Sequence, residues 1–276
     1  MKILVSGASG YVGRNLIKFL NDLDCEVLTI CVFQQDLMSL EMQIKHLDKQ
    51  LQKLEPQICD VHTFVHLAWM DTNDWNSSVH QTINKQLSEY LIKRLCSGGI
   101  EHVIVAGTCL EYGVSGGNLS ENLPAKPKNE YALAKHALYK SIRIMANKNG
   151  FKLSWLRLFY IFGGDQPPTT IYGSMMEQII RGETTFNMSS GQQVRDYLHI
   201  DTVCQMILAV VVSKEGFDVV NICSGQGFTL EKHVRSWLHD INPEINLSLN
   251  LEALPDRNDE PFHLWGSSQK FDSLLN

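Results

Sequence analysis

The sequence predicts an α/β protein built on a doubly wound parallel sheet, with a smaller C-terminal lobe. Short apolar runs alternate with segments of helical periodicity, and a glycine-rich turn, GASGYVG, separates the first run from the first helical segment. Runs without polar alternation are typical of parallel strands that helices cover on both faces. The runs expected to form strands are KILVSG, EVLTICV, TFVHLAW, HVIVAGT and KLSWLRLF.

The order of the segments also predicts how the chain divides. Residues 34–57, rich in Gln, Leu and Lys, occupy the place where a third strand and helix belong, and we expect a short strand near Gln43–Leu47. After residue 160 the pattern is interrupted by loops that contain Gly163, Gly164, Pro167 and Pro168. We therefore expect a larger domain formed by residues 1–159 and about 199–222. A smaller, substrate-binding lobe would comprise about 160–198 and 223–276.

Composition and charge exclude several classes of protein. The 276 residues include 24 Lys and Arg against 30 Asp and Glu, a net charge of -6, without a basic run, so nucleic acid is not expected as a partner. The longest apolar run, MILAVVV, is too short to span a bilayer, and the N-terminus shows no secretion signal. The scattered cysteines, without a CxxC pair, fit neither a disulfide framework nor a thiolate metal site. We expect a cytoplasmic protein without a membrane partner or a bound metal ion.

The glycine turn GASGYVG predicts a dinucleotide site. It places Gly7, Gly10 and Gly13 between the first strand and the apolar helix RNLIKFLNDL. Glycine lets backbone N–H groups approach a pyrophosphate, and a helix N-terminus offers unpaired donors with a partial positive charge. Plain turns also collect glycine, but the position between an N-terminal strand and a helix favours dinucleotide binding. The larger domain is therefore expected to bind NAD or NADP.

The end of the second strand indicates which of the two is preferred. Sites that prefer NAD usually have an Asp or Glu there to bind the ribose 2'-hydroxyl, whereas this strand offers Ile30, Cys31 and Val32. Without that carboxylate a 2'-phosphate is not repelled, and Arg14 is close enough in sequence to bind it. Arg14 could equally be a solvated residue of the first helical turn. These observations favour NADP, with NAD as the alternative.

The segment NEYALAKHALYKSIRIMANKNG predicts a helix with Asn129 as its N-cap and Gly150 as its stop. Tyr131 and Lys135 then lie one turn apart on one face. A Lys cation near a phenol favours the phenolate, so we expect it to lower the pKa of Tyr131 toward working pH. Such a phenol suits proton exchange with a carbinol or a carbonyl. A YxxxK pair alone is a loose pattern, and its meaning depends on the motifs around it.

Six motifs in a fixed order carry a family resemblance. They are GASGYVG, VHLAW at 65–69, GTCLEYG at 107–113, YALAK at 131–135, LRLFYIFG at 156–163 and QVRDYLHID at 193–201. This order resembles the extended short-chain dehydrogenase/reductase family, in particular its nucleotide-sugar epimerases, dehydratases and ketoreductases. Within that group the sequence is most similar to reductases of nucleotide-linked 4-keto-6-deoxy sugars. The resemblance covers nearly the whole chain.

The resemblance implies roles for the matching residues. Tyr131 would be the catalytic acid and base, Lys135 would hold the nicotinamide ribose, and Thr108 would hydrogen-bond the reacting oxygen. Asp48 would meet the adenine. The expected cofactor ligands are Gly7, Ser9, Gly10, Tyr11, Val12, Gly13, Arg14, Asp48, Leu67, Ala68, Tyr131 and Lys135. The expected substrate ligands are Trp69, Thr108, Cys109, Tyr160, Arg195 and Arg257. The two arginines match ligands of the substrate's diphosphate, although either could instead be a surface ion-pair residue.

The stretch GTCLEYG narrows the expected chemistry. The sugar 4,6-dehydratases of this family have an acidic pair directly after the Ser or Thr, because eliminating water requires an acid and a base besides the Tyr. Here those positions are Cys109 and Leu110, so dehydration is not expected. Strand alternation would turn Glu111 to the face opposite Leu110, and we interpret it as structural. Reductases that also epimerise C3 and C5 use a cysteine two residues before the Tyr; Cys109 lies three before Tyr112, so we interpret it as a small filler.

The sequence therefore predicts NAD(P)H-dependent reduction of the C4 keto group of a nucleotide-linked 4-keto-6-deoxy sugar, in deoxysugar biosynthesis. The residue Tyr160, where family epimerases and dehydratases commonly have Asn, favours this activity. The alternatives are a nucleotide-sugar 4-epimerase with tightly bound NAD and a non-catalytic NADP-binding regulatory protein, which would typically lose Tyr131 and Lys135. The resemblance implies a homodimer through the Tyr131 helix and the segment Asn84–Leu95, whose apolar stripe could instead face its own sheet. His66 is interpreted as a buried structural residue.

Overall fold

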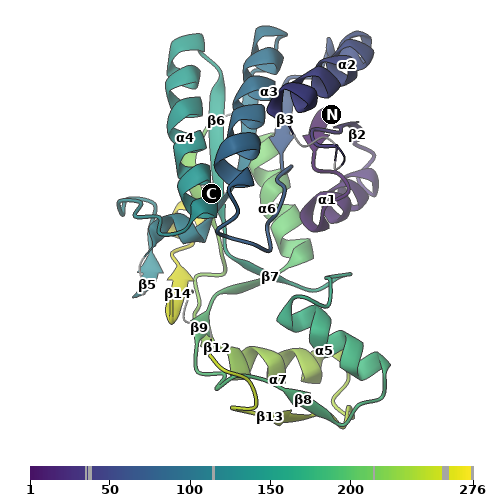
Figure 1. The fold of residues 1–276 in the computed structure, drawn as a ribbon, viewed down its shortest axis with the longest axis vertical. Coiled ribbons are helices and arrows are strands. Elements are labelled where there is room, and N and C mark those ends of the chain that lie inside the picture. The colour runs from purple at the N-terminus through teal and green to yellow at the C-terminus, as the bar shows by residue number, and fades with distance from the viewer. Residues whose placement is uncertain (35, 37–38, 114–115, 214, 257–260, 275–276) are drawn as a thin grey trace.

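The centre of the larger part of the molecule, the upper part of Figure 1, is a six-stranded parallel sheet. Its strand order is β11-β6-β4-β3-β1-β2. The computed structural model describes residues 1–34, 36, 39–113, 116–213, 215–256 and 261–274. The strands are β1 (Lys2–Ser6), β2 (Glu26–Ile30), β3 (Thr63–His66), β4 (His102–Thr108), β6 (Lys152–Leu158) and β11 (Asp218–Ile222). The first five lie in the apolar runs of the sequence, so the expected parallel sheet is confirmed.

Helices cover both faces of this sheet, as a doubly wound fold requires. On one face lie α2 (Leu40–Ile58), α3 (Lys85–Ser97) and α4 (Glu130–Asn149), whose apolar side chains share a core with β3 and β4. On the other face lie α1 (Tyr11–Asn21) and α6 (Ile200–Val212), which pack against β1, β6 and β11. The middle residues of β1 and β4 are buried and apolar, because helices cover both faces of the sheet.

The strand expected near Gln43–Leu47 is wrong, because this segment lies inside the helix α2. The hydroxyl of Ser39 caps the helix. Gln43, Leu47 and Leu51 are its buried residues, and their spacing of four is a helical period that a strand would not show. The sheet therefore ends at β2, and β1 lies between β2 and β3.

The carboxyl ends of β1, β3 and β4 meet at one edge of the sheet. The glycine turn follows β1, Leu67 and Ala68 follow β3, and Thr108 closes β4. The strand order reverses at β1, with α1 on one face of the sheet and α2 on the other. Open α/β sheets bind their ligands at such a position. The fold thus gathers the predicted cofactor and catalytic residues at a common edge.

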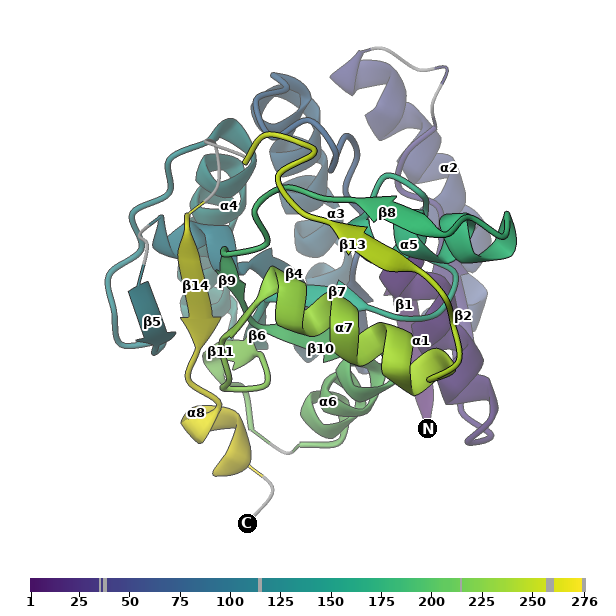
Figure 2. The same cartoon turned by 90° about the horizontal axis from the view of Figure 1, so that it is seen from below.

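A smaller group of elements lies beyond this edge (Figure 1 and Figure 2). The helices α5 (Ile171–Ile180) and α7 (Leu230–Ile241) share a core with β8 (Thr185–Asn187) and the segment before β13 (Ser248–Asn250). The short helix α8 (Gln269–Asp272) returns to the large sheet, where Phe271 joins its core. The remaining strands are β5 (Gly116–Leu119), β7 (Tyr160–Phe162), β9 (Val194–Arg195), β10 (Tyr197–His199), β12 (Phe228–Thr229) and β14 (His263–Gly266).

Candidate active site

Thr108, Tyr131 and Lys135 come together where β4 ends against the start of α4. Thr108 is the last residue of β4, and Tyr131 and Lys135 lie one turn apart in the first turns of α4. The helix begins and ends as expected, since Asn129 caps it with its side chain and Gly150 closes it with a φ of 80°. The side chains of Tyr131 and Thr108 are hydrogen-bonded to each other.

The ammonium group of Lys135 is buried beside the end of β4. The residue is 2% exposed, and its Nζ donates a hydrogen bond to the carbonyl oxygen of Ala106 at 2.7 Å. Nζ also lies 3.8 Å from the centre of the Trp69 ring and 5.8 Å from that of Tyr131. Burial lowers the pKa of Lys135 to about 7, while the charge of Glu111 acts in the opposite direction. Small changes around Lys135 therefore decide its charge at neutral pH.

The phenol of Tyr131 is protonated at neutral pH. Burial raises its pKa well above the usual value, Cys109 and Glu111 raise it further, and the hydrogen bond with Thr108 lowers it. This direction is opposite to the lowering expected from the Lys135 cation. The reason is that desolvation dominates, and Nζ lies 5.8 Å from the ring centre, bound to a backbone carbonyl. The neutral phenol is the form that can donate a proton.

The residues after Thr108 form a 3-10 turn, η2 (Cys109–Tyr112), and not the extended strand assumed for their alternation. The Thr108 hydroxyl accepts a hydrogen bond from Leu110 N at 3.2 Å, and Glu111 Oε1 accepts one from Thr108 N at 3.1 Å. The turn therefore caps itself. Leu110 and Glu111 do face opposite ways, but the turn is the cause.

Glu111 lies behind this turn among buried polar side chains. It is fully buried, and its Oε1 also accepts a hydrogen bond from Trp155 Nε1 at 2.7 Å. Its Oε2 lies 3.4 Å from Arg157 Nε and 3.5 Å from His136 Nδ1. Glu111 is thus structural, as interpreted, and it holds the backbone of Thr108 directly. The sequence contained no signal for that second property.

A cavity of about 180 Å³ opens in front of Thr108 and Tyr131. It is lined by Thr72, Trp75, Gly107, Thr108, Cys109, Leu110, Tyr131, Leu158, Phe159 and Tyr160. Thr108, Cys109 and Tyr160 were expected to contact substrate, whereas Trp75 was not. None of the lining residues within the described ranges has a carboxylate or an imidazole. The cavity offers hydroxyl groups and one thiol beside apolar walls.

Three other residues were predicted to bind substrate: Trp69, Arg195 and Arg257. Trp69 lies against Lys135 and is not among the described residues that line the cavity. Arg195 in β9 donates a hydrogen bond to the carbonyl oxygen of Phe262 at 3.1 Å, and its guanidinium lies 5.2 Å from the ring centre of Tyr160. Arg195 therefore contacts Tyr160 in the cavity wall and is not among the described residues that line the cavity. Arg257 lies outside the described residues.

The glycine turn has the geometry of an anion-binding turn. Gly7 has a φ of 77°, and a Cβ there would lie 2.6 Å from Ala68 N; a Cβ at Gly13 would lie 2.0 Å from Gly7 O. Ser9 and Gly10 are exposed at the tip, and no side chain caps the N-terminus of α1. The first N–H groups of α1 are thus open to an anion. These residues fit the pyrophosphate of a dinucleotide.

Arg14 and Asp48, which were predicted to bind the cofactor, have side-chain partners within the chain. Arg14 donates from Nε to Asp165 Oδ2 at 2.6 Å and from its terminal nitrogen to the Asp165 carbonyl at 2.7 Å. Asp48 lies on α2, where it accepts a hydrogen bond from the Tyr90 hydroxyl at 2.7 Å, and it does not follow a third strand. Their contacts with a 2'-phosphate and with adenine stay predictions.

Two buried histidines are His66, the last residue of β3, and His80, in the segment that follows β3. His66 bridges Ser6 Oγ at 2.7 Å and Ser88 Oγ at 2.9 Å, so its structural interpretation is confirmed. His80, which no motif indicated, begins a π-helical turn, η1 (His80–Asn84), and its ring centre lies 5.3 Å from that of Tyr131. Such turns are frequent at functional sites. Trp75 and His80 follow VHLAW in an irregular segment, where periodicity carries no information.

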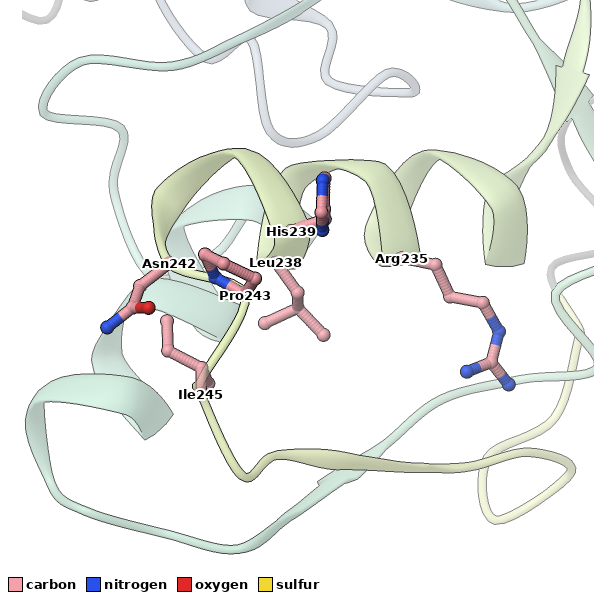
Figure 3. A pocket seen from close by; sticks show the side chains of 6 residues that line it. All are labelled: Arg235, Leu238, His239, Asn242, Pro243 and Ile245. Carbon is pink, nitrogen blue, oxygen red and sulfur yellow. The ribbon is translucent and has the colours of Figure 1, made fainter.

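A second hollow, of about 220 Å³, lies at the C-terminal half of α7 and the turn after it (Figure 3). Its lining residues are Arg235, Leu238, His239, Asn242, Pro243 and Ile245. Arg235 is paired with Glu231 one turn away, at 2.9 Å from Nε to Oε1. None of these residues belongs to a predicted site, and the hollow contains none of the groups gathered around Tyr131.

The parallel sheet, the glycine turn and the Tyr131–Lys135 pair beside Thr108 define a dinucleotide-dependent enzyme of the extended short-chain dehydrogenase/reductase type. The chain belongs to the NAD dependent epimerase/dehydratase family, whose family model matches residues 3–223. No helix within the described ranges is long and apolar enough to cross a membrane, and no cluster of three or more potential metal ligands occurs there.

Known proteins resemble the chain over most of its length. It is 26% identical to dTDP-6-deoxy-L-talose 4-dehydrogenase (NAD(+)) of Aggregatibacter actinomycetemcomitans, covering 97% of this chain and 100% of that protein. It is also 26% identical to GDP-6-deoxy-D-talose 4-dehydrogenase of the same organism, covering 83% and 76%. A solved variant of UDP-glucuronic acid 4-epimerase from Bacillus cereus, bound to UDP-4-deoxy-4-fluoro-glucuronic acid and NAD, shares 21% identity and a TM-score of 0.78 over 100% of this chain and 93% of that one. This last likeness confirms the doubly wound fold.

Proposed function

We propose that the protein reduces the C4 keto group of a nucleotide-linked 4-keto-6-deoxy sugar with NADPH or NADH. The observation that carries the proposal is the composition of the cavity, where the hydroxyls of Thr108 and Tyr131 meet and no described lining residue has a carboxylate or an imidazole. Hydride transfer to a ketone requires one proton, whereas elimination of water requires a further acid and base. The described residues of the cavity supply the groups for reduction and include no further acid and base for dehydration.

Each of the three site residues has a distinct part in this reaction. The nicotinamide cofactor supplies a hydride. As C4 gains its new C–H bond, the electron pair of the carbonyl double bond moves to the oxygen, and Tyr131 donates its proton there. The Thr108 hydroxyl hydrogen-bonds the same oxygen and fixes its position. Lys135, when charged, stabilises the phenolate that Tyr131 leaves. The raised pKa of Tyr131 supports this direction, because the phenol begins neutral.

We propose NADP as the preferred cofactor, with NAD as the alternative. The glycine turn and the N-terminus of α1 would hold the pyrophosphate, and Lys135 would hold the nicotinamide ribose. The strand β2 ends without a carboxylate to reject a 2'-phosphate. Arg14 would exchange its pairing with Asp165 for that phosphate. The ratio of kcat/KM for NADPH and NADH tests this, since Arg14→Ala is expected to reduce it.

The apolar walls of the cavity support a 6-deoxy sugar. C4 of a hexose is bonded to C5, which carries C6, so the groups around C6 lie next to the reacting carbonyl. Trp75, Leu110 and Leu158 line the cavity and would offer apolar surface to these groups. A C6 hydroxyl against them would lose its hydrogen bonds to water without replacement. The names of the two dehydrogenases from Aggregatibacter place their chemistry at position 4 of 6-deoxytalose joined to a nucleotide.

We also propose that Arg195 and Arg257 bind the substrate's diphosphate, and that the protein is a cytoplasmic homodimer. Leu87, Leu91 and Leu95 of the expected dimer stripe are buried in the chain's own core, so they do not supply the contact. Exposed side chains of α4, such as Ile144 at 70%, would supply it instead. Light scattering tests this, since Ile144→Glu is expected to convert a dimer into a monomer.

A nucleotide-sugar 4-epimerase is the second candidate. Thr108, Tyr131 and Lys135 suit oxidation of C4 followed by its reduction as well as they suit reduction alone. The Bacillus cereus neighbour is a 4-epimerase whose structure contains NAD. This function requires NAD to remain bound through both steps.

The decisive measurement follows the near-ultraviolet absorbance of NADPH or NADH with a panel of nucleotide-linked 4-keto-6-deoxy sugars. We expect absorbance to fall in step with product for one sugar, and Tyr131→Phe to be nearly inactive. Bound NAD after purification, together with interconversion of ordinary sugar nucleotides and no consumption of reduced cofactor, would instead establish the epimerase.

A further inference from the structure

Trp69 and His80 form a rigid bracket beside the ammonium of Lys135. The face of the Trp69 ring lies 3.8 Å from Nζ, and its indole N–H donates a hydrogen bond to His80 Nδ1 at 3.1 Å. The two rings are stacked, with centres 6.3 Å apart and an interplanar angle of 24°. The edge of Trp69 also meets the ring of Tyr131 at 6.1 Å between centres. The bracket therefore contacts both members of the predicted catalytic pair.

Hydrogen bonds at both nitrogens fix the tautomer of His80. An indole N–H only donates, so Nδ1 must accept from Trp69. The carbonyl of Asp74 only accepts, so Nε2 must carry the proton that it shares with that oxygen at 2.8 Å. The His80 ring therefore cannot rotate without losing both bonds. The ring of Trp69 inherits this fixed orientation.

The π-helical turn that begins at His80 secures the other side of the bracket. Asn84, the last residue of that turn, accepts a hydrogen bond from Met70 N at 3.0 Å and donates one to Met70 O at 2.9 Å. Its amide nitrogen also lies 3.3 Å from His80 Nδ1. The turn His80–Asn84 therefore fixes both the backbone of Met70, next to Trp69, and the ring of His80.

The neighbours of Lys135 other than Trp69 stabilise its ammonium charge only weakly. Nζ donates to Ala106 O, and no carboxylate within the described ranges forms an ion pair with it. The titratable groups that face it are Tyr131 on its own helix, His66 on β3, His80 on η1 and Glu111 on η2. The one carboxyl group among these belongs to Glu111, and it is engaged with Arg157 and Trp155. An aromatic face is the remaining surface that attracts a cation.

We propose that Trp69 and His80 are positioning residues: His80 holds the indole, and the indole face holds the Lys135 ammonium charged and in place beside Tyr131. This role differs from the substrate contact expected for Trp69. It does not depend on which keto sugar is reduced, because it concerns a group that is present in the protein alone.

The test is a carbon-13 NMR titration of the Cε of Lys135 in the purified protein, assigned by the signal that Lys135→Met removes. Trp69→Leu removes the aromatic face, and we expect the titration midpoint of Lys135 to fall by about one pH unit. Trp69→Phe keeps a face but loses the indole N–H, so a smaller fall is expected. His80→Asn places an acceptor near the position of Nδ1 and is expected to preserve the midpoint, while His80→Leu lowers it.

A matched control exists in the smaller part of the molecule, where Lys232 Nζ lies 3.7 Å from the ring centre of Phe228. Phe228→Leu removes a face of the same kind and is expected to leave the Lys135 midpoint unchanged. An unchanged midpoint in Trp69→Leu, with the protein folded by circular dichroism, would overturn the proposal. If the leucine variant does not fold, the proposal is tested with Trp69→Phe, for which a smaller fall of the midpoint is expected.

The pH profile of kcat/KM gives a second readout once a substrate is known. The limb that reports loss of the ammonium is expected to move to lower pH in Trp69→Leu by the shift that the titration shows. A raised KM with an unmoved limb would mean that Trp69 contacts substrate and does not position Lys135. Absence of turnover with every sugar would contradict the proposed function alone, because the NMR titration requires no substrate.

Discussion

The two faces of the turn Cys109–Tyr112 differ in kind. Its front carries Cys109 and Leu110 into an apolar cavity. Its back carries Glu111, which is fully buried, toward the polar side chains of Trp155, Arg157 and His136. The protein therefore keeps a carboxylate one residue away from its candidate active site and turns it away from any substrate.

This difference separates side chains that position the site from side chains that would contact the substrate. A carboxylate in the cavity could deprotonate a sugar carbon, whereas the same group behind Thr108 can only orient the backbone and the field around it. The back fixes where Thr108 and Tyr131 stand, and the front decides what fits against them. Changes at the back should alter kcat, and changes at the front should alter the choice of substrate.

The largest expected effect comes from the proton donor itself. Tyr131→Phe removes the hydroxyl that the ketone oxygen needs, so kcat is expected to fall by about 1000-fold, within the range for a general acid. Steady-state kinetics with the identified sugar measures this. Tyr139→Phe is the matched control, because it removes a phenol hydroxyl from the same helix. That hydroxyl donates a hydrogen bond to Asp218 at 2.9 Å, and the kcat of this variant should stay near wild type. Equal losses in both variants would deny Tyr131 its role.

The sequence predicted the parts of the fold that local periodicity determines. Five strands and the helix with Tyr131 and Lys135 follow from apolar runs and capping residues close in the chain. The segment at Gln43–Leu47 was misassigned because a short amphipathic stretch does not by itself distinguish a period of two from one of four. The position of Glu111 could not be predicted, since its partner Trp155 is brought to it only by the pairing of β4 with β6.

The second prediction breaks the holding function at the back of the turn. Both oxygens of Glu111 accept hydrogen bonds, one from Trp155 and Thr108 and the other from Arg157. In Glu111→Gln an NH2 group replaces one of these oxygens and faces hydrogen-bond donors. We expect kcat to fall by about 100-fold through displacement of Thr108, with KM little changed. Kinetics and urea unfolding, measured together, separate this effect from loss of folded protein.

Glu121→Gln is the control for this change. Glu121 also accepts a backbone hydrogen bond, from Asn221 N at 2.8 Å, but stands outside the cavity. Its kcat should stay near wild type. If Glu111→Gln loses stability and keeps its kcat, the back of the turn only supports the fold.

The third prediction concerns two buried histidines of the central sheet, at the end of β3 and at the start of β4. Burial lowers the pKa of His66 from 6.5 to about 3 and that of His102 to about 4. The unfolded chain takes up these protons below its ordinary pKa while the folded protein does not. The free energy of unfolding should therefore decrease as the pH is lowered from about 6.5 to the pKa of the folded protein. The decrease should be about 1.4 kcal/mol per pH unit for each histidine.

Urea unfolding between about pH 7 and 5 measures this slope. His66→Asn should lower the slope by up to about 1.4 kcal/mol per unit, while the contributions of His102 and of His233, whose pKa burial also lowers, remain. His62→Asn is the control, since the His62 side chain is 64% exposed and its loss should leave the slope unchanged. The same slope in wild type and His66→Asn would show that His66 accepts its proton without unfolding.

The smallest expected effect lies at the front of the turn. Leu110→Thr places a hydroxyl on the apolar wall, where it can hydrogen-bond a C6 hydroxyl that leucine leaves unpaired. An apolar pocket rejects an added hydroxyl only moderately, so the preference for a 6-deoxy over a 6-hydroxy keto sugar should relax by about tenfold in kcat/KM. Leu133→Thr, at an exposed position of α4, makes the same exchange away from the cavity and should keep the preference. A fall in kcat for both sugars alike would mean that the two faces are not independent, and that Leu110 helps to hold Thr108 as Glu111 does.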